Sequence, residues 1–237
     1  MTSSISVAMT TSRAFSVNDE LRARVAANLA LLRQRVATAS PWPDRVRVVA
    51  VTKTLDVTYV EVALALGLDT LGENYVDELC EKRRATSTTA QWHFLGALQS
   101  NKIARALECA DVLCGVSRAK EVRTIARLRP GAVIDVQVDF TGAAQRNGAP
   151  RDEVGSLVAL ARELGLEVRG LMTVAPQDPH AGEAAFVATS ALADQLELSE
   201  RSMGMSDDLE AACRAGSTEI RVGRALFGPR VPVGRLA

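Results

Sequence analysis

Residues 47–53 read Arg-Val-Val-Ala-Val-Thr-Lys, a short apolar run that ends in a lysine and precedes a turn into a helix. A continuous apolar run of this length is typical of a strand buried in a parallel sheet. Ligands of α/β proteins bind at the carboxyl ends of such strands. At that position, desolvation can lower the pKa of Lys53, so that the side chain loses its proton and becomes a nucleophilic amine. The expected partner of this amine is a carbonyl, joined to it as a Schiff base.

Seven more strand-like runs follow the first one, with helical patterns between them. The expected strands are residues 47–53, 69–73, 91–96, 111–116, 132–138, 167–173, 201–205 and 219–224. The expected helix N-caps are Asp56, Ser100, Ser117 and Ser206, and the glycines expected just after helices are Gly67, Gly165 and Gly216. Eight strand–helix units in a chain of 237 residues predict an α/β fold, a single (β/α)8 TIM barrel over residues 17–237. An open doubly wound sheet is the alternative, and the lack of a G-x-G-x-x-G that opens a helix counts against it.

Two segments precede this repeat. Residues 17–38 carry leucines and valines at helical spacing, which predicts an extra N-terminal helix. Residues 1–16 are rich in Ser and Thr and lack the basic stretch and apolar core of a secretory signal, so we expect a disordered leader.

Composition narrows the class of protein. A formal net charge of zero gives no general attraction to nucleic acid or to an anionic membrane, and no apolar run approaches the roughly 20 residues that a membrane span needs. The cysteines are Cys80, Cys109, Cys114 and Cys213. They have no C-x-x-C spacing, and we expect reduced, mostly buried thiols in a cytoplasmic protein. No metal site is expected, because zinc needs clustered ligands and the only histidines are His93 and His180.

Side-chain parity points two cations toward the inside of the expected barrel. Lys53 shares a face with Val51 in the first strand, and Arg221 shares a face with Gly223 in the last strand. The first and last strands are neighbours in a closed barrel, so Lys53 and Arg221 would flank one small cavity. In the alternative, both cations pair with interior acids such as Glu73.

Small residues follow the last two expected strands. Residues 202–206 read Ser-Met-Gly-Met-Ser, residues 221–224 read Arg-Val-Gly-Arg, and each stretch leads into a helix start. Barrels often bind phosphate with these loops, because glycine permits a close backbone approach and helix N-termini present free N–H groups. An aldehyde that carries a phosphate fits this arrangement, because its phosphate would bind these loops and its carbonyl would react with Lys53. Pyridoxal 5′-phosphate is the economical choice, and a sugar phosphate in an aldolase is the alternative.

A set of motifs connects the chain to a known family. In chain order they are V-V-A-V-T-K-T (48–54), G-E-N-Y (72–75), W-H-F-L-G-x-L-Q-S-N-K (92–102), R-G-L-M (169–172), S-M-G-M-S-D-D-L-E-A-A (202–212), A-G-S-T-E-I-R-V-G (215–223) and L-F-G (226–228). On these motifs the chain resembles the pyridoxal phosphate homeostasis proteins, which are similar to the barrel domain of alanine racemase. The resemblance covers nearly everything from residue 48 to residue 228.

The resemblance implies a role for each residue of the site. It implies that Lys53 carries pyridoxal phosphate as a Schiff base, that Arg221 lies beside the pyridine nitrogen, and that Asn74 lies near the ring. The residues that it implies around the phosphate are Ser202, Gly204, Ser206 and Gly223. Arg224 departs from the family, which usually has Thr or Ser there. An arginine either replaces the lost hydroxyl with a charge-assisted contact to phosphate or turns to solvent.

The function implied is a non-catalytic carrier that holds the reactive aldehyde, releases it to apoenzymes and serves intracellular vitamin B6 homeostasis. Arg221 fits this role, because a charged arginine cannot take the proton of the pyridine nitrogen and so favours a poor electron sink. The alternative is a pyridoxal phosphate-dependent amino-acid racemase, and a Schiff-base aldolase is a third hypothesis. Racemisation needs an acid or base on each face of the substrate carbon. In alanine racemase the second is a tyrosine from another domain, whereas Tyr59 and Tyr75 lie in early helices here. We expect a monomer, with no nucleic-acid or membrane partner.

Overall fold

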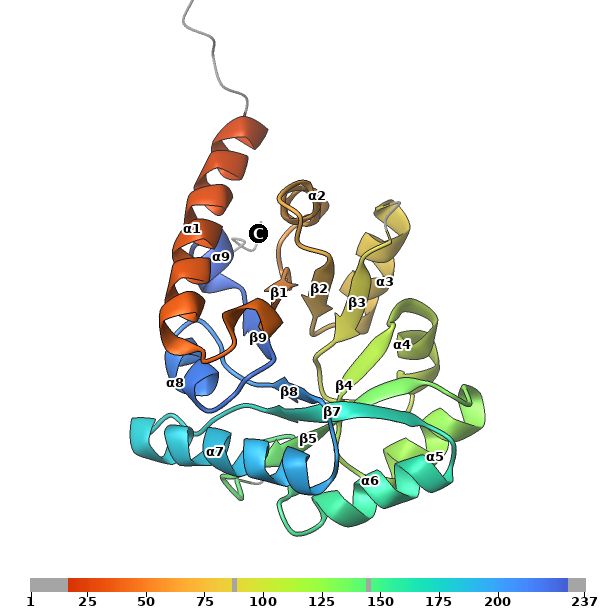
Figure 1. Ribbon diagram of the computed structural model, residues 1–237. Helices are drawn as coiled ribbons and strands as arrows, with labels where there is room; N and C mark the ends of the chain where they lie inside the picture. Colours follow the sequence, from red (N-terminus) through yellow and green to blue (C-terminus); the bar gives the residue numbers. More distant parts are fainter. Residues whose placement is uncertain (1–16, 87–88, 144–145, 230–237) are drawn as a thin grey trace, which may run out of the picture.

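Strand β1 (Arg47–Val51) pairs in parallel with β2 (Thr70–Glu73) on one side and with β9 (Glu219–Val222) on the other. The remaining strands of the ring are β3 (Gln91–Phe94), β4 (Val112–Val116), β5 (Val133–Asp139), β7 (Glu167–Thr173) and β8 (Glu200–Ser202). They follow one another in chain order, and β4 pairs with β5, so the ring closes. A two-residue strand, β6 (Ala149–Pro150), pairs with the end of β5. The predicted (β/α)8 barrel is thus confirmed in this computed structural model, which describes residues 17–86, 89–143 and 146–229 (Figure 1).

Helices surround the barrel between the strands. They are α2 (Val57–Ala65), α3 (Val76–Ala85), α4 (Ile103–Cys109), α5 (Ala119–Leu128), α6 (Val154–Glu163), α7 (Pro179–Gln195), α8 (Leu209–Arg214) and α9 (Arg224–Phe227). The predicted extra helix is α1 (Val17–Ala39), which packs beside α8 and α9 from the other end of the chain and leads through a 3-10 turn, η1 (Pro43–Arg45), into β1 (Figure 1). The expected leader, residues 1–16, lies outside the described residues. Within the described ranges, none of the helices combines the length and apolar character that crossing a bilayer requires.

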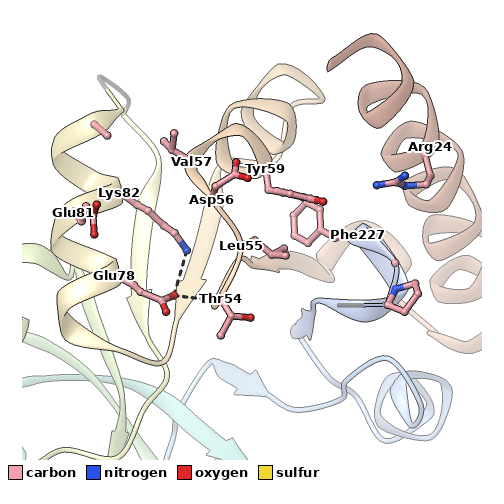
Figure 2. A pocket seen from close by; sticks show the side chains of 13 residues that line it. Arg24, Thr54, Leu55, Asp56, Val57, Tyr59, Glu78, Glu81, Lys82 and Phe227 are labelled. Atoms are coloured by element: carbon pink, nitrogen blue, oxygen red, sulfur yellow. Dashed lines mark hydrogen bonds and ion pairs between the residues drawn. The ribbon is translucent and has the colours of Figure 1, made fainter. Parts of the chain in front are cut away.

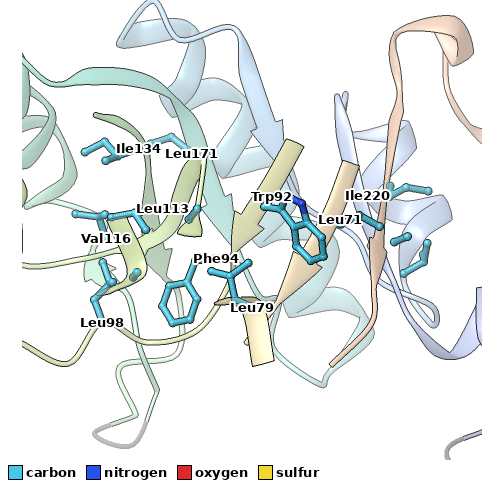
Figure 3. Close-up of a cluster of buried hydrophobic side chains, with 14 of the residues drawn as sticks. Leu71, Leu79, Trp92, Phe94, Leu98, Leu113, Val116, Ile134, Leu171 and Ile220 are labelled. Atoms are coloured by element: carbon cyan, nitrogen blue, oxygen red, sulfur yellow. The ribbon is translucent and has the colours of Figure 1, made fainter. Parts of the chain in front are cut away.

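The main hydrophobic core lies between the strands and the helices that cover them. Leu71 of β2 and Trp92 of β3 are 0% and 1% exposed, and they belong to one cluster with Leu79 of α3 (Figure 3). Each fully buried side chain of this kind contributes about 1.5–3 kcal/mol relative to an exposed one. This core fixes the outer faces of the strands and leaves their inner faces to form the site.

The glycines predicted to end helices have the expected geometry. Gly67, Gly165 and Gly216 follow α2, α6 and α8 with φ angles of 78°, 76° and 91°, in the region that glycine adopts without strain. The predicted N-cap Asp56 is also confirmed, because its side chain accepts a hydrogen bond from the Thr58 amide at 2.8 Å.

The other three predicted N-caps are wrong. The helices α4, α5 and α8 are preceded by Lys102, Arg118 and Asp208 in place of Ser100, Ser117 and Ser206. At α5 the physical reason is visible. The Glu121 carboxylate, inside the first turn, accepts hydrogen bonds from the amides of Ser117 (2.8 Å) and Arg118 (3.0 Å). An acid within the first turn therefore binds the amides that precede the helix, and the N-cap position falls on Arg118.

The cysteines also differ from expectation. Cys80 of α3 and Cys109 at the end of α4 form a disulfide, with their Cα atoms 5.1 Å apart. The expectation of reduced thiols is wrong for this pair, because α3 and α4 pack against each other and bring together residues separated by 29 positions. Cys114 and Cys213 are free and buried, as expected. Burial raises the pKa of Cys213 to about 11, so this thiol is neutral at pH 7.

Candidate functional site

Six of the eight predicted site residues line one cavity at the carboxyl ends of the barrel strands. They are Lys53, Asn74, Ser206, Arg221, Gly223 and Arg224. The cavity has a volume of about 870 Å³, within the range of small-molecule sites. Residues from both ends of the sequence therefore meet here because β1 and β9 are neighbours in the ring.

Lys53 follows the end of β1 and is half-buried in the cavity wall. Val51 lines the same cavity, whereas the hydroxyl of Thr52 between them donates to Glu73 at 2.6 Å. This alternation is the parity expected for an extended chain. Glu73, the acid considered as an interior partner for the cations, pairs with Lys82 of α3 at 2.7 Å.

Arg221 is buried, and acceptors on two neighbouring strands hold its guanidinium. Nη1 donates to the hydroxyl (2.9 Å) and the carbonyl of Ser202, and Nη2 donates to the carbonyl of Thr173 (2.7 Å). Burial lowers the pKa of Arg221, and the negative charge of Glu219 opposes this effect. The result is a fixed cation in the cavity wall.

Deeper in the barrel, toward the amino ends of the strands, lies a layer of charged residues. Glu219 accepts a hydrogen bond from the Ser202 hydroxyl at 2.8 Å and pairs with Arg169 at 3.2 Å. Arg169 also makes two hydrogen bonds to Asp135, at 3.0 and 2.6 Å, and His93 lies 3.6 Å from Glu219. Burial would raise the pKa of Glu219, but the His93 ring and the Arg169 guanidinium hold it below its ordinary value. The carboxylate therefore stays ionised, and its negative charge offsets the positive charge of Arg169.

Two predicted site residues lie outside the cavity lining. Ser202 is fully buried, and its hydroxyl bridges Arg221 and Glu219. Gly204 has a φ angle of 95°, and a Cβ atom at this position would lie 2.7 Å from the Cβ of Ala212 in α8. Ser202 therefore contacts the guanidinium, and Gly204 permits the close packing of α8 against the loop after β8.

The loops after β8 and β9 are joined to each other at the cavity. The hydroxyl of Ser206 accepts a hydrogen bond from the amide of Ala225 at 3.0 Å, and Arg224 forms an ion pair with Asp207. Ser206 thus binds the first turn of α9, and not the start of its own helix. Both loops, with their polar groups, border the same space.

The extra helix also holds one of these loops. Arg35 of α1 donates to the carbonyl of Ser206 at 3.1 Å and makes two hydrogen bonds to Glu210 of α8, at 2.6 and 2.9 Å. A helix outside the eightfold repeat therefore contacts the loop that carries Ser206.

The sequence reasoning missed Arg146, a further cation in the cavity lining. Arg146 lies in the loop between β5 and β6, and its Nη1 donates to the carbonyls of Val174 (3.2 Å) and Ala175 (3.1 Å) after β7. Arg146 lies in a loop, away from the strand ends at which site residues were expected, and a single arginine in a loop carries no pattern that marks it.

Comparison with known proteins gives consistent matches over most of the chain. The family model described as alanine racemase, N-terminal domain, matches residues 22–231. A curated relative from Pseudomonas aeruginosa named pyridoxal phosphate homeostasis protein is 36% identical over 220 residues, which are 88% of this chain and 94% of the relative. A relative of the same name from Deinococcus radiodurans is 39% identical over 209 residues, which are 86% of this chain and 99% of the relative.

Among solved structures, PipY of Synechococcus elongatus with pyridoxal phosphate bound is 31% identical. The match covers 86% of this chain and 100% of that one, with a TM-score of 0.72. The family model, the curated relatives and the PipY structure all indicate the same family. The chain belongs to the pyridoxal phosphate homeostasis protein family, built on the alanine racemase N-terminal domain.

Proposed function

We propose that this protein binds pyridoxal 5′-phosphate as a Schiff base on Lys53 and acts as a non-catalytic carrier in vitamin B6 homeostasis. The observation that carries the proposal is the placement of an amine, a buried guanidinium and two polar loops around one cavity. The volume of about 870 Å³ accommodates a phosphorylated pyridine. The names of the relatives and the bound PipY structure support the same ligand.

In the proposal, different residues of this chain bind different parts of the ligand. The unprotonated Lys53 amine adds to the aldehyde carbon, and the aldehyde oxygen leaves as water; hydrolysis reverses both steps. Arg221 donates to the pyridine nitrogen, and Asn74 lies beside the ring.

The phosphate group is bound by the loops after β8 and β9 in the proposal. The residues that contact it are Ser206, Gly223 and Arg224. Ser202 acts by holding Arg221, and Gly204 acts by shaping the loop after β8. Pyridoxal phosphate would supply a reactive aldehyde and a conjugated ring, and the protein would determine how long the aldehyde is kept from other amines.

A carrier is favoured over a racemase by the groups that face Lys53. No tyrosine is among the described residues that line the cavity. Tyr59 lies outside it and packs edge-on against Phe227, with ring centroids 5.6 Å apart. Arg221 would keep the pyridine nitrogen unprotonated. Rapid exchange of the α-proton of alanine in heavy water would overturn the carrier assignment in favour of a racemase.

The proposal includes a setting for the carrier. We propose that it works in the cytoplasm as a monomer and passes pyridoxal phosphate to apoenzymes. Light scattering on the purified protein tests whether it is a monomer. Transfer is tested by mixing the loaded protein with an apoenzyme and following the activity that the apoenzyme gains.

The decisive experiment is borohydride reduction of the protein loaded with pyridoxal phosphate, followed by peptide mapping. The expected result is a yellow protein whose cofactor becomes fixed at Lys53. Lys53→Ala should remain folded and colourless, and Lys102→Ala, at an exposed lysine, is the matched control that should behave like wild type. Undiminished binding by Lys53→Ala would refute the covalent site.

A further inference from the structure

The turn that carries Lys53 is bound from the α3 side by residues that do not line the cavity. The carbonyl of Thr52 accepts hydrogen bonds from the Leu55 amide (3.0 Å) and from Nζ of Lys82 (2.7 Å). Two residues further on, the amide of Thr54 donates to the Glu78 carboxylate at 2.8 Å. The residues on both sides of Lys53 are therefore held by one helix, α3.

Thr54 has an unusual backbone conformation. Its φ angle is 63°, in the left-handed region that non-glycine residues rarely adopt. Such a residue persists only where its surroundings fix it. Two hydrogen bonds fix it here: the one from the Leu55 amide to the Thr52 carbonyl closes the turn around Thr54, and the one from the Thr54 amide to Glu78 ties the turn to α3.

Lys82 links the two hydrogen-bonded residues into one cluster. Its Nζ donates to Glu73 at 2.7 Å and to Glu78 at 3.4 Å, in addition to the Thr52 carbonyl, and its side chain is 7% exposed. All three protons of a buried ammonium are thus directed at acceptors. Lys82, Glu78 and Thr54 also line a second cavity, of about 970 Å³, together with residues of α1, α2, α3 and α9 (Figure 2).

We propose that Glu78 and Lys82 are positioning residues for Lys53: they hold the turn in the conformation that directs its amine into the cavity. This inference rests on the proposed function of Lys53. The physical reason is that a long lysine side chain has considerable rotamer freedom, so the direction of its Cα–Cβ bond limits which atoms its amine can reach. Loosening Thr54 would let the backbone rotate at Lys53 and lower the fraction of time in which the amine meets the aldehyde.

Glu78 is the better residue to test. Removing Lys82 would leave Glu73 as an uncompensated buried charge, and that variant is expected to unfold. The Glu78 side chain is 31% exposed, so Glu78→Ala is expected to fold. Glu78→Gln keeps an oxygen that can accept from the Thr54 amide. Glu81→Ala, at an exposed acid on the same helix and beside the same cavity, is the matched control.

Two measurements decide the proposal. The first is amide hydrogen exchange at Thr54 in protein without ligand. Glu78→Ala should raise its exchange rate about tenfold or more, the effect of losing one hydrogen bond to a charged acceptor, while Glu78→Gln and Glu81→Ala stay near wild type. The second is the rate at which pyridoxal phosphate plus borohydride labels Lys53, which should fall about tenfold in Glu78→Ala and recover in Glu78→Gln.

The outcomes separate this inference from the proposed function. Failure of wild type to label at Lys53 would overturn the proposed function, and the exchange experiment would still decide whether Glu78 holds the turn. Normal Thr54 exchange and normal labelling in Glu78→Ala would overturn the positioning role. Equal loss in Glu78→Gln and Glu78→Ala would also overturn it, because the retained acceptor would then have no effect.

Discussion

Replacing Glu219 with glutamine tests whether the charged layer inside the barrel supports the fold. Glu219 is fully buried and pairs with Arg169 and with Arg47, each at 3.2 Å. Removing one partner of a buried ion pair costs about 3–5 kcal/mol. Asp135 still neutralises Arg169 in the variant, so we expect the lower end, about 3 kcal/mol. With a urea dependence of about 3 kcal/mol per molar, the unfolding midpoint should fall by about 1 M.

The pH dependence gives this prediction a second signature. The pKa of Glu219 in the folded protein lies below the value of about 4.3 that a glutamate has in an unfolded chain. Its ionised form therefore adds stability above pH about 4.3, and this contribution is lost as the pH falls through the folded pKa. A glutamine does not titrate. The gap in unfolding free energy between wild type and Glu219→Gln should be widest near pH 7 and should narrow as the pH falls below about 4.3.

The control is Glu183→Gln, the same chemical change in an exposed pair. Glu183 lies 3.7 Å from Arg214, and both side chains are about half exposed. Surface pairs of this kind contribute about 0–1 kcal/mol, so this variant should unfold close to wild type. A loss for Glu219→Gln no larger than that of the control, or a gap that stays constant in acid, would refute the reasoning.

Three further predictions concern single features. Arg224→Ala should weaken retention of pyridoxal phosphate about three- to tenfold and leave pyridoxal retention nearly unchanged, since the guanidinium is expected to contact phosphate. Equal effects on both ligands, measured by equilibrium dialysis, would contradict that contact. Thiol titration of denatured protein should find two free thiols, those of Cys114 and Cys213, and four after reduction; four before reduction would contradict the Cys80–Cys109 bond. Gly204→Ala should lower the unfolding free energy by about 1–3 kcal/mol, because its Cβ would meet Ala212 as well as strain the backbone. Gly67→Ala, with a φ angle of 78° and open space around it, should cost less in the same urea titration.

The sequence was most informative where a pattern repeats. Eight apolar runs in order predicted the closed ring, and parity in the first and last strands predicted that Lys53 and Arg221 line one cavity. Both follow from backbone geometry, which is the same in every strand. Strand lengths were predicted less well: β8 ends at Ser202 and not at residue 205. Gly204, which has a positive φ angle, therefore lies in the loop after β8 and not in the strand as predicted.

The sequence was least informative where one helix reaches another element. The hydrogen bond of Arg35 to the loop after β8 joins residues 171 positions apart, and the hydrogen bond of Lys82 to the Thr52 carbonyl joins α3 to the turn after β1. On a helix, an exposed charge and a charge that reaches a distant loop have the same spacing in sequence. Only the tertiary packing distinguishes them, so neither Arg35 nor Lys82 could be identified from periodicity.

Two buried ionic clusters flank the proposed ligand, and stability alone does not account for them. One, around Glu219, fixes the guanidinium of Arg221 through Ser202; the other, around Lys82, fixes the turn of Lys53. Apolar side chains of similar volume usually stabilise a fold at least as well as buried ion pairs do. Ion pairs, however, impose direction, because each hydrogen bond restricts an angle as well as a distance. The carrier that we propose must hold one amine and one guanidinium at a set separation while its aldehyde is bound and released. The hydrogen bonds of these two clusters orient Arg221 and the turn of Lys53 from outside the cavity, so they add no reactive side chain to it.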